Sequence, residues 1–330
     1  MKYHIPFHIQ KPGQQIRYDD RIMLLGSCFT EHIGGRLDKY GWRTLENPTG
    51  IIFNPNSIRK TIDRVVSNDP VRPDELVLNN ELWHHWDFHS TFSHIDPVLG
   101  LEGMNHSIQE ACHFLKEAQW LILTLGSAFQ YFVKDTAYGV SNCHRVPAGE
   151  FKKRMLEIED IKEDLMHIRN TVQAFNPGIR ILLTISPVRH IRDGVIENNR
   201  SKARLVEAVH SIVDHISVLY YPAYELMIDV LRDYRFYDVD MVHPNYAATQ
   251  TVWEFLVEHY MDGSTQEYLQ KMIEINDAFR HRTRFPGSQA HQRFLQAYLG
   301  KVQDLKIRYP HWDALPYESY FSENISKKGH

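Results

Sequence analysis

Short apolar runs alternate with amphipathic segments along most of the chain. Four runs have the continuous apolar character of strands that are buried on both faces. They are residues 22–25, 120–125, 179–185 and 218–221. Between them, apolar residues recur three and four positions apart, as in amphipathic helices. These segments are residues 58–66, 108–115, 151–175 and 198–216. The alternation predicts parallel βα units and therefore an α/β fold.

Capping residues mark several helix boundaries. Ser107-x-x-Glu110 is a capping box that predicts a helix start at Ser107, and Asn245 is a natural N-cap for a later helix. Near the C-terminus, Ser264-x-x-Glu267 has the same capping pattern. We expect residues 1–260 to form one α/β domain and residues 261–330 to form a helical extension packed on it.

Composition and charge narrow the class of protein. The 330 residues are 43% hydrophobic and 24% charged with a formal net charge of −4, which is typical of a soluble globular protein and gives no basic surface for nucleic acid. No apolar stretch approaches the roughly 20 residues of a membrane helix, and the N-terminus lacks the apolar core of a secretory signal. Cys28, Cys112 and Cys143 suit free thiols in a reducing compartment, so we expect a cytoplasmic protein.

The first apolar run ends at a turn that carries two nucleophilic side chains. Gly26 permits a sharp turn, and Ser27 and Cys28 follow it at the start of a predicted helix. A helix N-terminus favours negative charge, and sites in open parallel sheets form outside the carboxyl ends of strands. The alternative is structural: Ser27 caps the helix and Cys28 is a small buried apolar residue.

A second motif supplies the partners that such a nucleophile needs. Asp240 and His243 lie three residues apart, just before the helix that Asn245 begins. A serine or cysteine attacks weakly until a base takes its proton, and a carboxylate can orient that base. We therefore predict that His243 is the base and Asp240 its orienting carboxylate.

The segment 82–97 crowds histidines, tryptophans and aspartates together. His85 and His89 are four residues apart with an aspartate between them, so a metal site has to be weighed. The segment has weak helical character and lacks the His-Glu-x-x-His pattern of zinc enzymes. We expect a pocket wall that includes His89, and neither a metal nor another cofactor.

Two further polar loops follow predicted strands. One carries Asn142 and His144, and a turn role for Asn142 remains the alternative. The other carries Arg189 and His190, which could meet an anionic or sugar substrate or lie on the surface.

Taken together, these motifs resemble the SGNH (GDSL-type) hydrolase superfamily, and more closely its GSCFA-domain branch. The resemblance covers roughly residues 20 to 260. Its residues are Gly26-Ser27-Cys28-Phe29-Thr30, the segment 47–55, Ser141-Asn142-Cys143-His144, Ser186-Pro187-Val188-Arg189-His190 and Asp240-x-x-His243-Pro244.

The resemblance implies a three-layer α/β/α sandwich with a short parallel sheet and an ester hydrolase site. His243 would be the general base and Asp240 its orienter. The oxyanion donors would be a main-chain amide at the nucleophile, Gly50 and an asparagine. Residues 126–129 lack that asparagine, so Asn142 from the following loop takes its place.

The superfamily's Gly-Asp-Ser-Leu, laid over residues 26–29, places Cys28 at the nucleophile position. A thiolate at a helix N-terminus beside His243 is expected to have a depressed pKa. Ser27 remains the alternative if the turn is one residue tighter.

Two functions from different classes follow. The first is a hydrolase or acyltransferase that acts on a small-molecule or carbohydrate ester, such as a carbohydrate O-acetyl group, with Trp83 and Trp86 able to stack on sugar rings. The second is a binding or assembly protein that keeps the fold and is catalytically weak or inactive. Neither involves a nucleic acid or a membrane, and the oligomeric state is left open.

Overall fold

A five-stranded parallel sheet forms the centre of the computed structural model, which describes residues 5–326. Residues 1–4 of the predicted α/β domain and residues 327–330 of the predicted helical extension lie outside this range. The strands are β1 (Arg21–Gly26), β2 (Arg43–Glu46), β5 (Trp120–Leu125), β9 (Arg180–Ile185) and β10 (Val218–Tyr221). Their order is β10-β9-β5-β1-β2, and each neighbouring pair is parallel.

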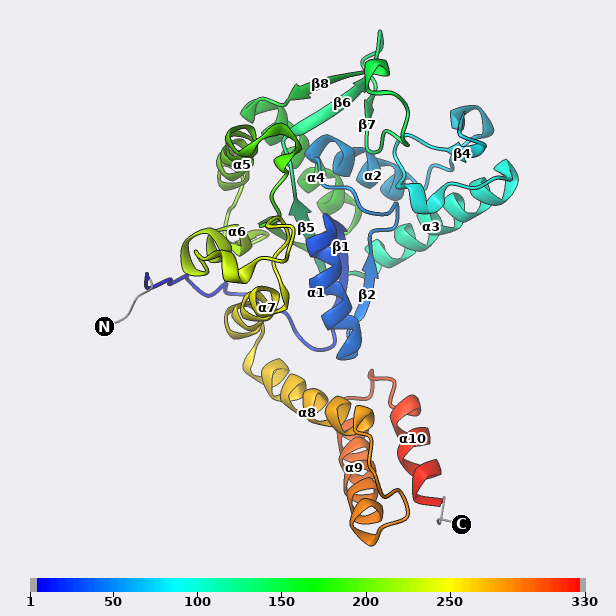
Figure 1. Ribbon diagram of the computed structural model, residues 1–330, viewed down its shortest axis with the longest axis vertical. Coiled ribbons are helices and arrows are strands. Elements are labelled where there is room, and N and C mark those ends of the chain that lie inside the picture. The colour runs from blue at the N-terminus through cyan, green and yellow to red at the C-terminus, as the bar shows by residue number, and fades with distance from the viewer. Residues whose placement is uncertain (1–4, 327–330) are drawn as a thin grey trace.

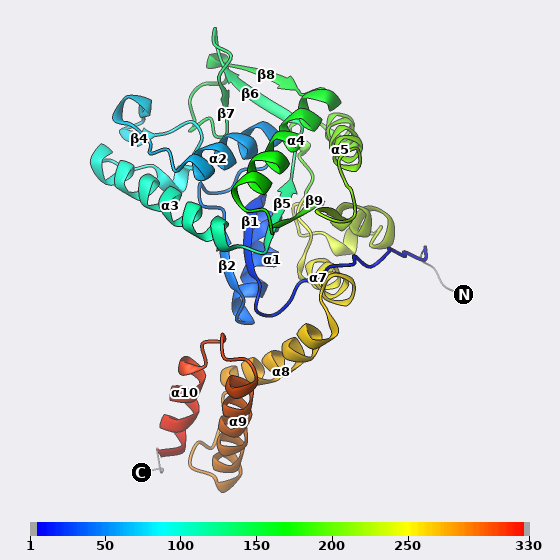
Figure 2. The same cartoon turned by 180° about the vertical axis from the view of Figure 1, so that it is seen from behind.

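Helices cover both faces of this sheet. The first face carries α1 (Cys28–Lys39), the short α6 (Ala223–Glu225) and α7 (Tyr246–Tyr260), and the second carries α2 (Pro55–Ser67), α3 (Pro97–Glu117), α4 (Ile158–Phe175) and α5 (Val195–His210). Figure 1 shows α1 in front of the sheet, and the reverse view in Figure 2 shows α3 and α4 on the other side.

Alternate residues of β1 enter the two cores between the layers. Ile22 and Leu24 pack with the first face, whereas Met23 and Leu25 pack with the second. A strand buried on both faces needs this continuous apolar run. The predicted three-layer α/β fold is confirmed.

The first residues of one predicted helix belong instead to a small antiparallel sheet. It consists of β6 (Phe129–Val133), β7 (Gly139–Val140) and β8 (Phe151–Met155), in the order β7-β6-β8. The prediction of a single helix over 151–175 is wrong at its start, because β8 pairs with β6 along its whole length and α4 begins only at Ile158. Phe151 and Met155 are four residues apart, a spacing that places two side chains on one face in a strand as well as in a helix.

Other boundaries also differ from those predicted. Asp96 caps α3, so Ser107 lies inside this helix and its hydroxyl donates to the Pro48 carbonyl. Asp262, and not Ser264, caps the helix α8 (Gly263–Arg280). The predicted N-cap Asn245 is confirmed, since its side chain accepts from the Ala248 N–H at 3.2 Å. The strands β3 (Val77–Asn79) and β4 (Leu82–His84) form a short hairpin, and β4 occupies the start of the segment 82–97 that was predicted to be a loop.

The C-terminal helices α8, α9 (Gln289–Arg308) and α10 (Leu315–Ser326) lie at the opposite end of the molecule from β6, β7 and β8 (Figure 1). Tyr268 of α8 donates to the Tyr40 carbonyl at 2.8 Å, and its ring packs edge-on against Trp42. These contacts join the helices to the end of α1 and the start of β2. No helix within residues 5–326 has both the length and the apolar character needed to cross a membrane.

Candidate active site

The turn after β1 requires a glycine. A Cβ on Gly26 would lie 2.4 Å from the Thr124 carbonyl oxygen of β5, and the Gly26 φ is +152°. The Gly26 N–H donates to the Asn47 side-chain oxygen at 2.9 Å, which ties the turn to the segment after β2. Gly26 thus brings the start of α1 close to the middle of the sheet.

Ser27 and Cys28 have different positions in this turn. Ser27 is the N-cap of α1, is 3% exposed, and accepts from the Phe29 N–H at 3.3 Å. Cys28 is the first residue of the helix, and its side chain is partly exposed. Ser27 therefore has the capping role that the structural alternative gave it, while the Cys28 thiol has access to solvent.

A cavity of about 510 Å³ opens beside this turn. If the five strands are renumbered by their order in the chain and read from the β2 edge, they lie in the order 2-1-3-4-5. Successive connections therefore change direction across the sheet between β1 and β5. Ligands of open α/β sheets bind outside the carboxyl ends of the strands at such a point. The sequence-predicted site residues that line the cavity are Ser27, Cys28, Arg189, His190, Asp240 and His243.

Asp240 and His243 form a pair at this cavity. The Asp240 Oδ2 lies 2.6 Å from the His243 Nδ1, and its Oδ1 accepts from the main-chain N–H groups of Val242 and His243 at 2.9 and 3.0 Å. These hydrogen bonds lower the pKa of Asp240 to about 2. A carboxylate on Nδ1 leaves the Nε2 of His243 as the free nitrogen, which is the arrangement of an oriented base.

The thiol of Cys28 does not have the predicted depressed pKa. Burial raises the pKa of Cys28 above its ordinary value, and the Glu31 carboxylate adds to this effect. The prediction considered only the helix N-terminus and the imidazole, and it missed the desolvation of the thiolate.

Arg189 and His190 both reach the cavity from the segment after β9. Arg189 donates from Nη1 to the Met241 carbonyl at 3.3 Å and stacks on Tyr237 at 4.1 Å, so it holds the loop that carries His243. The His190 ring packs at a tilt against Phe53, with ring centroids 4.9 Å apart, and its buried Nε2 has no hydrogen-bond partner among the described residues. Burial lowers the pKa of His190 to about 4, so this ring is neutral at neutral pH.

Four predicted binding residues lie outside the cavity. Gly50 packs against His89, where an added Cβ would lie 2.2 Å from the His89 Cβ. The Asn142 side chain accepts from the His144 N–H at 2.8 Å. The His144 ring stacks on His84 at 4.3 Å and is 4% exposed. The structure thus places these residues in a neighbouring packed region.

The predicted sugar-stacking tryptophans are also outside the cavity. Trp83 pairs through its main chain with His94, and Trp86 packs edge-on against Phe151. No group of three or more histidine, cysteine or acidic side chains within residues 5–326 is arranged to hold a metal ion.

The GSCFA family model matches residues 21–255, and the C-terminal domain model of GSCFA domain proteins matches residues 273–326. The first match alone spans most of the chain. The chain belongs to the GSCFA family. No curated protein matches its sequence.

Two solved structures are similar to this GSCFA chain at low identity. One is a carbohydrate esterase family 3 protein from Talaromyces cellulolyticus, with 10% identity and a TM-score of 0.36 over 78% of this chain and 98% of that one. The other is a mutant acetyl esterase with acetate ion, with 10% identity and a TM-score of 0.35 over 78% of this chain and 99% of that one.

The structure of this GSCFA protein adds residues to the cavity that the sequence analysis missed. Phe53 precedes α2, and Tyr131 and Lys153 come from the small sheet, which was not predicted. Lys202 of α5 does not line the cavity; it is 1% exposed, and its Nζ donates to the carbonyls of Gly126 and Ser186. The sequence did contain a sign that Lys202 is buried, because it lies three residues before Leu205 and so falls on the apolar face of the predicted helix.

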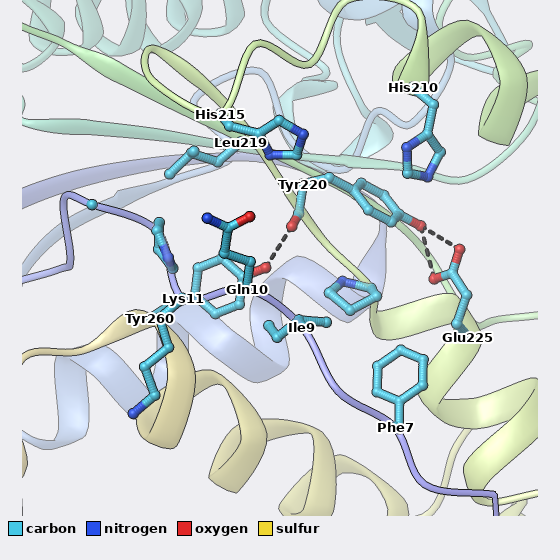
Figure 3. Close-up of a pocket in the computed structure, with 13 residues that line it drawn as sticks. Phe7, Ile9, Gln10, Lys11, His210, His215, Leu219, Tyr220, Glu225 and Tyr260 are labelled. Carbon is cyan, nitrogen blue, oxygen red and sulfur yellow. Dashed lines mark hydrogen bonds between the residues drawn. The ribbon is translucent and has the colours of Figure 1, made fainter.

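A second cavity, of about 390 Å³, lies at the β10 edge of the sheet (Figure 3). Phe7 and Ile9 of the N-terminal segment form one side, and Tyr220 and Glu225 form the other. The Tyr220 hydroxyl donates to both Glu225 carboxylate oxygens, at 2.9 and 2.8 Å (Figure 3). None of the predicted site residues of this GSCFA protein lines it.

Proposed function

We propose that this GSCFA protein is an SGNH-type ester hydrolase or acyltransferase, with Cys28 as nucleophile, His243 as general base and Asp240 as orienting carboxylate. One observation carries the proposal: residues more than two hundred positions apart in sequence line a single cavity at the sheet's reversal point. Its substrate is a small molecule or carbohydrate carrying an ester.

The reaction follows from the placement of these groups. His243 takes the thiol proton as the Cys28 sulfur bonds to the ester carbonyl carbon, and the carbonyl oxygen becomes an oxyanion. The Cys28 main-chain N–H at the start of α1 stabilises the negative oxygen, since the N–H groups of Ser27, Phe29 and Thr30 already have acceptors within the fold. The carbon–oxygen bond then breaks, the leaving alcohol takes the proton from His243, and a thioester remains.

The thioester is broken down by the same groups, with His243 again moving the proton. A water molecule, or an alcohol in a transferase, gives its proton to His243 and attacks the thioester carbonyl. The carbon–sulfur bond breaks, and the thiolate recovers the proton from His243. His190 lines the same cavity and supplies part of its wall beside these groups.

Aromatic rings line the cavity and support a sugar substrate. Its aromatic rings are Phe53, Phe129 and Tyr131, and Lys153 covers the last two at 4.3 and 5.1 Å. We keep a carbohydrate O-acetyl ester as the leading candidate, with these rings in place of the predicted tryptophans. The three free cysteines favour a reducing compartment, the cytoplasm.

A panel of variants tests this site with p-nitrophenyl acetate and acetylated sugars. Cys28→Ala and His243→Ala should each lower kcat/KM by at least about 10³-fold, because nucleophile and base act as one unit. Ser27→Ala should cost less, since it removes a cap worth about 1 kcal/mol of stability. Mass spectrometry of the acylated enzyme should find the acyl group on the Cys28 peptide. A rate indifferent to His243→Ala excludes the proposal, and a larger loss at Ser27 transfers the nucleophile role to that residue.

A binding role is the second candidate, and the raised pKa of the Cys28 thiol favours it, because less thiolate is then present at neutral pH. Gly50 and Asn142, the predicted oxyanion donors, also lie outside the cavity. Saturable binding of an acetylated sugar without turnover, unaffected by Cys28→Ala, would support this function.

A further inference from the structure

The cavity at the β10 edge of the sheet is closed by the N-terminal segment. The Phe7 ring packs against Phe255 of α7 with ring centroids 5.6 Å apart, and the Ile16 N–H donates to the Tyr260 carbonyl at 2.7 Å. Residues 9–13 line the cavity between these two anchors (Figure 3). The segment thus forms a wall over a space of about 390 Å³, which is in the size range of small-molecule sites.

The wall of this cavity is mainly apolar and aromatic. The rings of Phe7, Tyr220 and Tyr260 contribute to it, together with Leu219. Both tyrosine hydroxyls are already bonded, since Tyr260 donates to the Tyr220 carbonyl and Tyr220 donates to Glu225 (Figure 3). The two tyrosines therefore present their rings to the cavity and have no proton left to donate to a ligand.

Within the part of the chain that the structure describes, Glu225 is the only acidic side chain that lines the cavity. The Tyr220 hydroxyl shares its single proton between the two carboxylate oxygens, at 2.9 and 2.8 Å. A carboxylate can accept about four hydrogen bonds, so acceptor positions remain. Burial raises the pKa of Glu225, because its charge loses hydration. A cation in the cavity would compensate for that loss.

The other ionisable groups of the wall do not neutralise Glu225. Lys11 is exposed, and its side chain extends away from the carboxylate (Figure 3). His210 lies edge-on to the Tyr220 ring with ring centroids 4.6 Å apart, and neither His210 nor His215 forms an ion pair with Glu225. The negative charge is therefore available to a ligand that enters the cavity.

We infer that this cavity binds a small primary ammonium compound with an aromatic body. The ammonium N–H groups donate to the Glu225 carboxylate, and the body of the ligand packs on the rings of Phe7 and Tyr260. Aromatic faces also attract a cation, so the wall and the carboxylate favour the same ligand. The inference is independent of the proposed esterase function, because the two cavities share no lining residue.

Isothermal titration calorimetry of the full chain, with phenethylamine as the probe, tests this site. At pH 8 the amine is protonated, whereas phenethyl alcohol is neutral and hydrocinnamate is an anion of similar shape. Phenethylamine should bind at least about tenfold more tightly than phenethyl alcohol, and hydrocinnamate should not bind, because the carboxylate repels it. Equal affinities for amine and alcohol, or no binding of the amine at millimolar concentration, overturn the inference.

Variants then place the amine in the cavity. Glu225→Gln removes the charge and keeps the size of the side chain, so it should weaken phenethylamine at least about tenfold and leave phenethyl alcohol unchanged. Glu207→Gln, at an exposed position of α5, is the matched control and should bind like wild type. Cys28→Ala alters the other cavity and should also bind like wild type. Weaker binding in Cys28→Ala would place the amine at that cavity and contradict the inference.

A variant of the N-terminal segment covers the case in which Glu225→Gln does not fold. Phe7 lies outside the helices and strands, so Phe7→Ala should leave the sheet intact. The loss of its ring should weaken phenethylamine about fivefold. Phe285→Ala, at a position that is 72% exposed in the C-terminal region, is its control and should bind like wild type. Wild-type affinity in Phe7→Ala would show that the amine does not occupy this cavity.

Discussion

At the residue scale, the last residue of β1 and the two residues after it have separate tasks. Gly26 permits close approach to β5, Ser27 caps α1, and Cys28 presents a thiol to the cavity. The resemblance placed the nucleophile at Cys28, and the capping role of Ser27 agrees with that register. Burial then decides the chemistry of the thiol, because a desolvated thiolate needs a compensating charge.

Gly26→Ala tests the close approach. A methyl group 2.4 Å from the Thr124 oxygen forces the strands apart, so we expect the free energy of unfolding to fall by about 2 to 3 kcal/mol. Gly35→Ala is the matched control, because nothing lies within 4 Å of its added Cβ and alanine favours the helix by about 0.5 to 1 kcal/mol. Urea denaturation measures both. Equal stabilities for Gly26→Ala and wild type would show that the turn can relax.

At the element scale, α5 and the segment 82–97 use buried polar groups to hold loops together. Asn198 of α5 accepts from the His190 N–H at 2.8 Å, and Ser201 accepts from the Ala128 N–H at 2.8 Å. In the 82–97 segment, the His85 carbonyl lies 2.9 Å from the His144 Nε2. The histidine-rich segment therefore packs against the loop that carries His144, which explains why its histidines do not converge on the cavity.

The pH dependence of stability tests this packed region. Burial lowers the pKa of His144 from 6.5 to about 4, so below about pH 6.5 the unfolded chain binds a proton that the folded chain does not. The free energy of unfolding should fall as the pH drops from about 6.5 to 4, by up to about 3.4 kcal/mol from this residue.

His144→Gln should flatten that part of the curve, measured by urea denaturation at a series of pH values. His106→Gln, at an exposed position on α3, is the control and should follow wild type. A His144→Gln curve parallel to the wild-type curve would contradict the assignment.

At the scale of the whole molecule, the cavity and the C-terminal helices occupy different ends. The cavity opens at the carboxyl ends of the strands, near the small sheet, and α8, α9 and α10 lie at the other end (Figure 1). The apolar core on the first face nevertheless runs from Ile22 and Leu24 through Trp42 and Tyr268 to Leu295. A shared core predicts that the α/β part and the C-terminal helices unfold together.

Tyr268→Ala tests this coupling. Tyr268 is 1% exposed, so its truncation should cost about 3 to 5 kcal/mol and lower the stability of the whole chain in a single transition. Phe285→Ala, in the same region but 72% exposed, should change stability by less than about 0.5 kcal/mol. Circular dichroism and tryptophan fluorescence should give one midpoint. Two separated transitions would show that the predicted extension, residues 261–330, unfolds as its own unit.

The sequence by itself determined the features that depend on neighbouring residues. Four of the five strands of the parallel sheet, the glycine turn, the Asn245 cap and the spacing of Asp240 and His243 are local patterns, and each appears where it was predicted, whereas the edge strand β2 was not predicted. Which polar loops converge depended on tertiary structure, because strand order and loop packing brought His190 and His243 to the cavity and left Asn142 and His144 outside. The β8 strand and the environment of Cys28 were decided in the same way, by pairing with β6 and by burial of the thiol in the folded chain, since both depend on residues distant in the chain.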